Sequence, residues 1–201
     1  MAKLNFKYAT MNSGKTIDLI RTAYNYTENG FRVLVMKPKK DTKGNNNLDS
    51  RIGLTRSVDI LIDDNTNIIE SIQNRYTGDL KCILVDEAEL LSKEKIDELY
   101  LSSKIFDIPV ICYGLRTNFK MEGFEGATRL LEIAENLEEI KTLCECGEIA
   151  RYAGRMINNN YTLNGEEILI DGECDNVKYV PLCGDCYLQK VKKINYRKIL
   201  K

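Results

Sequence analysis

The chain has 201 residues, of which 43% are hydrophobic, and this is enough for one substantial core with a small additional domain. Its 29 basic and 30 acidic side chains leave a net charge of -1, which argues against a dedicated nucleic-acid-binding protein with its usual basic surplus. The N-terminal segment lacks the apolar run of a signal peptide, and no apolar stretch approaches the roughly 18 residues that a membrane span needs. We therefore expect a cytoplasmic protein that has no membrane partner.

The chain begins with a predicted strand and a predicted helix. Apolar and polar residues alternate over 3–9, which is typical of a strand. A helix is predicted over 16–29, because Ile17, Ile20 and Tyr24 recur at helical spacing and a glycine follows at its end. A phosphate-binding type of loop lies between the two.

The alternation of strands and helices continues along the chain. The apolar patterns predict strands over 31–38, 81–87 and 108–115 and helices over 66–76 and 93–106. The polar segment 39–54, rich in Gly and Asn, is predicted to be a mobile loop. Strands that alternate with helices imply a parallel sheet with right-handed crossovers, so we expect an α/β fold with helices flanking the sheet.

The pattern changes near Lys141, where a second, smaller domain is expected to begin. Four clustered cysteines follow, together with a predicted hairpin over 161–170 that turns at Asn164 and Gly165. The basic tail 189–201 is predicted to form a helix with a frayed end. The predicted divisions are a main α/β domain at 1–140, a cysteine-containing domain at 141–190 and the C-terminal tail at 191–201.

The segment ATMNSGKT, from Ala9 to Thr16, has the ending of a P-loop. Such a loop points backbone N–H groups at phosphate oxygens, and the following helix adds its dipole. Gly14 permits close approach, Lys15 offers a charge to the phosphates, and Thr16 offers a hydroxyl to magnesium. Ala9 replaces the usual first glycine, which is tolerable if its φ is negative. The predicted phosphate-binding residues of this loop are Ala9, Thr10, Met11, Asn12, Ser13, Gly14, Lys15 and Thr16.

Acidic residues end the buried strand 81–87, at the edge of the sheet where ligands bind in this fold class. Asp86 is predicted to hold Mg²⁺ together with Thr16, and Glu87 to take a proton from an attacking hydroxyl. Strand alternation is expected to turn these two adjacent side chains in different directions. The alternative is a pair of solvated acids that opens a helix. The predicted nucleotide contacts of this segment are Asp86, Glu87, Ala88 and Glu89.

Seven cysteines and the complete lack of histidine restrict the possible metal chemistry. Two close pairs can supply a closed, tetrahedral, all-thiolate zinc site of structural type, formed by Cys144, Cys146, Cys183 and Cys186. The alternative is four free thiols. Cys82 and Cys112 lie in predicted strands and are expected to be inert core residues, and Cys174 is unassigned.

The order of these motifs is distinctive when three further segments are added: ICYGLRTNF at 111–119, FEG at 124–126 and KYVPLCGDCY at 178–187. Nearly the whole chain resembles the zinc-containing thymidine kinases. The resemblance implies an ATPase-type sheet, a zinc domain with a lasso loop that closes over the nucleoside, and transfer of the γ-phosphoryl group of ATP to the 5′-hydroxyl of thymidine.

The resemblance also implies roles for particular residues. Glu87 matches the general base of the family, and Asp41 matches an acid of its mobile loop. The residues that match the wall of the nucleoside pocket are Leu115, Phe119, Phe124 and Tyr179. Without the resemblance, core packing explains the two phenylalanines equally well. The family further suggests deoxyuridine as a second substrate, thymidine triphosphate as a feedback inhibitor and a homotetramer.

Several positions depart from the family pattern. Glu89 and Leu90 stand where the family often has Gln-Phe, Lys43 stands where many members have arginine, and Ala153 lies where some members place a residue near the thymine methyl group. Two alternatives stay open, a helicase-like P-loop ATPase with a zinc module and a non-catalytic nucleotide sensor. The arginine that meets the transferring phosphoryl group is not identified, and Arg51, Arg116 and Arg155 are the candidates.

Overall fold

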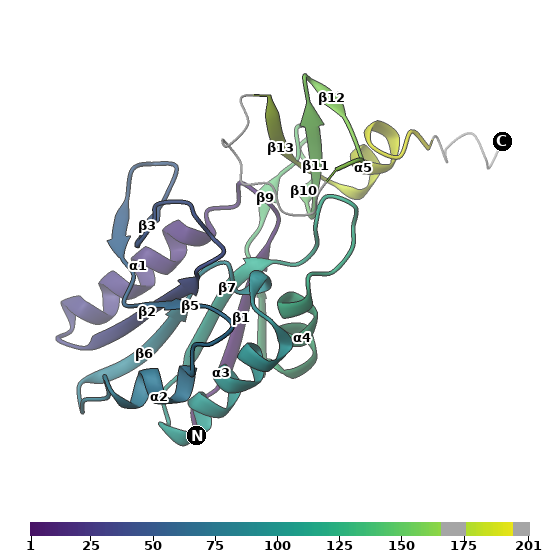
Figure 1. Cartoon of the computed structure of the whole chain (residues 1–201). Helices are drawn as coiled ribbons and strands as arrows, with labels where there is room; N and C mark the ends of the chain where they lie inside the picture. Colours follow the sequence, from purple (N-terminus) through teal and green to yellow (C-terminus); the bar gives the residue numbers. More distant parts are fainter. Residues whose placement is uncertain (166–175, 195–201) are drawn as a thin grey trace. The chain divides into compact units, whose positions relative to one another are not determined.

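The computed structural model describes residues 1–165 and 176–194 (Figure 1). The chain divides into two compact units. The first, here called the sheet unit, consists of Met1–Tyr8, Gly14–Arg116 and Phe124–Ile140. The second, here called the cysteine unit, consists of Ala9–Ser13, Thr117–Gly123 and Lys141–Lys201.

The sheet unit is built on a six-stranded sheet in the order β5-β2-β6-β7-β1-β8. Parallel pairs join β1 to β8, β2 to both β5 and β6, and β6 to β7. The strands are β1 (Leu4–Ala9), β2 (Arg32–Pro38), β5 (Ile60–Ile62), β6 (Leu80–Val85), β7 (Val110–Leu115) and β8 (Asn136–Glu139). The predicted α/β fold with a parallel sheet is confirmed.

Helices cover both faces of this sheet (Figure 1). They are α1 (Lys15–Glu28), α2 (Ile68–Gln73), α3 (Lys93–Ile105) and α4 (Glu125–Ile133), together with the short 3-10 helix η1 (Ala88–Leu90). Along β2, Val33 and Val35 pack in the cluster that holds α1, whereas Leu34 and Met36 pack in the cluster that holds α2, α3 and α4. Strand alternation thus explains why the central strands are apolar on both faces.

The buried face of α1 differs from the predicted one. Leu19 and Ala23 are completely buried, whereas Tyr24 is 56% exposed. Ile17 and Ile20 are only partly buried. The bulky residues that suggested the apolar stripe therefore flank it, because the close contact between the helix and the sheet is made by Leu19 and the small side chain of Ala23.

Besides the short helix η1, five elements of the sheet unit were not predicted. The segment expected to be a loop, 39–54, contains β3 (Asn47–Asp49), which pairs antiparallel with β4 (Thr55–Ser57). Two more are β8, which lies at the edge of the sheet with exposed polar residues, and the short helix α4. The fifth is strand β5, which was missed because only three residues form it.

The cysteine unit contains two small antiparallel sheets and one helix. One sheet pairs β9 (Thr142–Leu143) with β10 (Ile149–Ala150), and the other has the order β12-β11-β13. Its elements are β11 (Tyr152–Ile157), β12 (Asn160–Tyr161), β13 (Val177–Leu182) and α5 (Gly184–Lys190). Strands β11 and β12 form a hairpin that turns at Asn158 and Asn159, which both have positive φ, and this hairpin was not predicted.

Some predictions fall outside the described part of the chain. The second half of the predicted hairpin, 166–170, lies there, as do Cys174 and residues 195–201 of the tail. Helix α5 begins and ends earlier than the helix predicted for the tail. None of the described helices is long and apolar enough to cross a membrane.

Candidate active site and metal centre

The start of α1 has the backbone of a phosphate-binding loop. Gly14, which directly precedes the helix, has φ 82° and ψ 20°, a left-handed conformation that favours glycine. Lys15 is the first helical residue and its side chain is almost completely buried. The side-chain hydroxyl oxygens of Thr10 and Ser13 are buried and lack a hydrogen-bond partner among the described residues. Backbone amides at a helix start suit an anionic phosphate.

Ala9 is the buried last residue of β1 and is not among the residues with positive φ. Its strand conformation is open to any residue, so we expect Ala9→Gly to change ATP affinity by less than about threefold, with a slight loss of stability from added chain entropy. The matched control is Gly14→Ala, in which a side chain at φ 82° strains the loop and should weaken ATP binding. Calorimetric titration of both variants with ATP tests this. A large gain in affinity for Ala9→Gly would show that the methyl group obstructs the loop.

The predicted magnesium ligands Thr16 and Asp86 lie next to each other. The Thr16 hydroxyl donates to Asp86 Oδ2 over 3.1 Å. Asp86 Oδ1 is buried and has no partner among the described residues. Burial, reinforced by the charge of Glu87, raises the pKa of Asp86 to about 7, although Lys15 and Thr16 act in the opposite direction. A hydroxyl beside a buried, incompletely bonded carboxylate fits a hard divalent cation.

Glu87 has an unusual backbone, with φ 46° and ψ 40° in the left-handed region. Strand β6 ends at Val85, so the strand alternation expected for Asp86 and Glu87 does not apply. Glu87 lies in a left-handed turn, and η1 follows directly. A non-glycine residue in this region is uncommon, and such residues cluster at functional sites.

Further carboxyl groups gather around Glu87. Burial and the charge of Glu87 raise the pKa of Asp41, against the opposing effect of Lys37. The same two causes raise the pKa of Glu89, which is 2% exposed. A β-carbon at Gly114 would lie 2.6 Å from Glu89 Oε2, so this glycine leaves the space that the acid fills. The sheet therefore carries a group of acids at the end of β6 whose proton affinities depend on one another.

The four predicted nucleoside contacts divide between the units. Leu115 ends β7, and Phe124 precedes α4 and packs on the core of the sheet unit. Phe119 and Tyr179 are buried together in one cluster of the cysteine unit. That all four wall one pocket stays a prediction.

Arg155 supports the Phe119 ring in the cysteine unit. Its side chain is completely buried, and its guanidinium carbon lies 3.8 Å from the centroid of the Phe119 ring. It also donates to the Asn164 carbonyl oxygen. This placement favours a structural role over contact with a transferring phosphoryl group. Sequence reasoning missed the role, because an arginine that stacks on a ring leaves no motif.

The four paired cysteines come together in the cysteine unit. The sulfur atoms of Cys144, Cys146, Cys183 and Cys186 all lie within 4.8 Å of one another. The Sγ atoms of Cys146 and Cys183 are 3.6 Å apart, and a tetrahedral site with Zn–S bonds of about 2.3 Å has edges of about 3.8 Å. The chemistry and spacing of this donor set therefore fit one zinc ion.

The cysteine cluster is joined to Phe119 through α5. Cys183 caps this helix, with its sulfur accepting from the Cys186 N–H over 3.4 Å. Tyr187 directly follows Cys186 and is completely buried. Its hydroxyl group donates a hydrogen bond to the Phe119 carbonyl oxygen over 2.6 Å. Cys82 and Cys112 instead lie buried in β6 and β7.

Comparisons with known proteins bear directly on these features. A sequence model of the family described as thymidine kinase matches residues 2–187. The thymidine kinase of Mannheimia succiniciproducens is 39% identical over 198 residues, which cover 97% of this chain and 100% of that protein. The thymidine kinase of Francisella tularensis is also 39% identical, over 91% of this chain and 95% of its own. The thymidine kinase of Streptococcus gordonii is 39% identical, over 94% of this chain and 97% of its own.

The chain belongs to the thymidine kinase family. The resemblance that the motifs indicated is confirmed over nearly the full length. Among solved structures, a Pif1 helicase from Candida albicans aligns over 69% of this chain and 36% of its own, with 12% identity and a TM-score of 0.41. A likeness this weak carries no argument for the helicase alternative.

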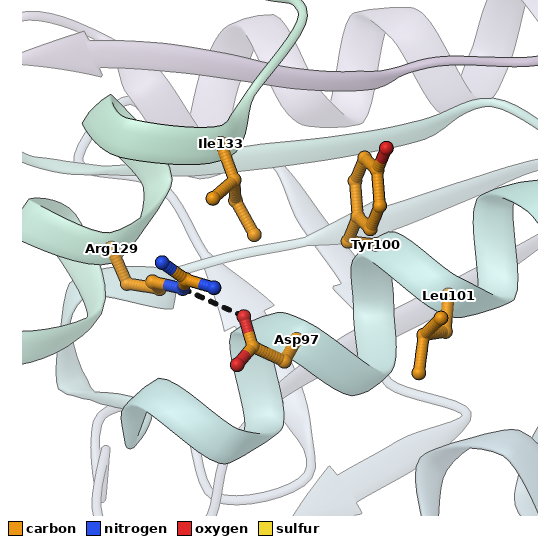
Figure 2. A pocket seen from close by; sticks show the side chains of 5 residues that line it. All are labelled: Asp97, Tyr100, Leu101, Arg129 and Ile133. Atoms are coloured by element: carbon orange, nitrogen blue, oxygen red, sulfur yellow. Dashed lines mark hydrogen bonds and ion pairs between the residues drawn. The ribbon is translucent and has the colours of Figure 1, made fainter.

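One surface pocket of this thymidine kinase family member lies apart from every predicted site residue. Its volume is about 450 Å³, and α3 and α4 supply its lining (Figure 2). Arg129 Nε and Asp97 Oδ1 form an ion pair over 2.7 Å there, beside Tyr100, Leu101 and Ile133. The Arg129 guanidinium group is bonded to the carboxylates of Asp97 and Glu132, so the acids beside it offset its charge and do not favour a phosphate there.

Proposed function

We propose that this chain transfers the γ-phosphoryl group of ATP to the 5′-hydroxyl group of thymidine, and also of deoxyuridine, as a thymidine kinase. The observation that carries the proposal is the contact between Thr16 and Asp86 at 3.1 Å, next to the left-handed Gly14 that begins α1. This arrangement has the parts that phosphoryl transfer needs, namely a phosphate cradle and a metal-binding pair. The family to which the chain belongs supplies the class of acceptor.

In the proposed reaction, the backbone of the loop Ala9–Thr16 and the ammonium group of Lys15 bind the ATP phosphates. Thr16 and Asp86 would hold magnesium, which would supply positive charge to offset that of the phosphate oxygens. Glu87 accepts the proton of the 5′-hydroxyl as the hydroxyl oxygen attacks the phosphorus atom. Adenosine diphosphate then leaves with the electrons of the broken P–O bond.

The cysteine unit is proposed to hold the nucleoside. Phe119 and Tyr179 present aromatic surface for a planar base. Leu115 and Phe124 are proposed as nucleoside contacts on the resemblance to the family alone. A structural zinc ion on the four paired cysteines would stabilise this unit without taking part in the reaction, because four thiolates close its coordination shell.

We expect pyrimidine nucleosides to be much better substrates than purine nucleosides, because a purine is too large for a pocket shaped to thymine. A coupled assay of ADP release compares thymidine and deoxyuridine with deoxyadenosine and deoxyguanosine. Competitive rates that favour a purine nucleoside would refute the pocket assignment.

The same assay separates the alternatives. A helicase-like ATPase would release ADP with single-stranded DNA and not with thymidine, and a nucleotide sensor would bind ATP without turnover. The family membership favours neither. We further propose thymidine triphosphate as a feedback inhibitor, a homotetrameric assembly and a cytoplasmic location, all on the resemblance to the family.

A further inference from the structure

A lysine is buried beside the proposed active site. Lys37 lies near the carboxyl end of β2 and its side chain is 0% exposed. The preceding residue, Met36, accepts from the Asp86 N–H over 2.9 Å, so β2 and the segment that carries the acids are joined there. Burying an ammonium group without partners costs several kcal/mol, and its contacts therefore have to be strong.

The segment 41–47 supplies those contacts. Lys37 Nζ donates to Asp41 Oδ2 over 3.2 Å, to the Lys43 carbonyl oxygen over 2.6 Å and to the Asn47 carbonyl oxygen over 3.3 Å. An ammonium group has three N–H donors, and here three oxygen atoms accept from it. The segment is thus wrapped around one internal cation.

Both carboxylate oxygen atoms of Asp41 accept hydrogen bonds within this arrangement. Its Oδ1 accepts from the Lys43 N–H over 3.2 Å, while Oδ2 accepts from Lys37. Glu87 directly follows Asp86, whose N–H bonds to the Met36 carbonyl oxygen next to Lys37. Burial, and after it the charge of Glu87, raises the pKa of Asp41. Lys37 is therefore the cation that offsets a carboxylate next to the proposed base.

We propose that Lys37 is a positioning residue for phosphoryl transfer, because its buried ammonium group fixes the segment 41–47 and keeps the Asp41 carboxylate beside Glu87. The catalytic part of this inference rests on the proposed kinase function. The anchoring part rests only on the contacts of Lys37.

Limited trypsin digestion tests the anchoring without any activity assay. The segment offers a cleavage site after Lys43, and cleavage there requires the segment to open. Lys37→Met keeps the length of the side chain and removes its charge. We expect it to speed this cleavage by about tenfold or more. The matched control is Lys39→Met, since Lys39 is exposed and forms only a surface ion pair with Asp63 at 3.4 Å. Equal cleavage rates in wild type and Lys37→Met would overturn the anchoring.

Kinetics test the positioning. Lys37→Met should lower kcat by about tenfold or more and leave the KM for ATP within about threefold, because the phosphates bind to another loop. Asp41→Asn should also lower kcat, and the double variant should fall no further than Lys37→Met alone, since both changes break the same contact. If the wild type is active and Lys37→Met has the same kcat per ATP-binding site, the positioning role of Lys37 is overturned. The proposed function is unaffected by that result.

Two further outcomes are distinguishable. An inactive wild type refutes the proposed function, while the digestion still decides the anchoring. If Lys37→Met does not fold, the double variant, which has no uncompensated buried carboxylate, is compared with Asp41→Asn alone. Equal cleavage rates in that pair would refute the anchoring, because Lys37 can still donate to the Lys43 and Asn47 carbonyl oxygens in Asp41→Asn.

Discussion

Glu87→Gln should lower kcat by roughly 10²-fold or more and leave the binding of ATP and thymidine largely intact. The chain has no histidine, so a carboxylate is the natural acceptor for the 5′-hydroxyl proton. Glutamine keeps the shape of the side chain and cannot act as a base. Residual activity should remain, because phosphoryl transfer depends mainly on positioning and charge.

The measurement is kcat for the purified variant together with calorimetric binding of both substrates. Glu94→Gln is a suitable control, because Glu94 is an exposed acid in the first turn of α3. A kcat within a few-fold of wild type would exclude Glu87 as the base. Asp41 would then be the next residue to test, as it lies within the electrostatic reach of Glu87.

Removal of the proposed zinc should weaken nucleoside binding and spare the ATP site. We expect about one zinc ion per chain in the purified protein, and much less in Cys183→Ser. Cys183 has two roles, since its sulfur belongs to the cluster and also caps α5. Its loss should therefore loosen the cysteine unit and weaken thymidine binding by about tenfold or more, whereas ATP binding should stay within about threefold.

Metal analysis and calorimetry on the same preparations test this. Cys82→Ala provides the control, because Cys82 is buried in β6 far along the chain from the cysteine cluster and its loss should not change the zinc content. Freshly prepared, active enzyme without zinc would contradict the assignment of the four cysteines.

The sheet could be predicted because its central strands are apolar on both faces and lie between helical patterns. The elements that were missed have weak patterns. Strand β8 is polar because it lies at an edge, and the hairpin that turns at Asn158 and Asn159 was missed because a second turn signal, Asn164–Gly165, stands close by. The face of α1 was misassigned because the largest apolar residues were taken for the buried ones, whereas Ala23 is completely buried.

The candidate site also has parts with a clear sequence pattern and parts without one. Lys15, Thr16 and Asp86 could be predicted because their chemistry is contained in short contiguous motifs. The left-handed backbone of Glu87 could not, because nothing in its neighbours requires it. The contact of Lys37 with Asp41 could not be predicted either, since it depends on how a polar segment folds back on a strand.

The hydrogen bond between Tyr187 and Phe119 gives the cysteine cluster an influence beyond its own turns. It joins two residues that are 68 positions apart in sequence, one of them directly after Cys186. We therefore expect a disturbance of the sulfur cluster to reach the main chain of Phe119 through Tyr187. If Phe119 contacts the base as proposed, loss of metal and loss of base binding should occur together.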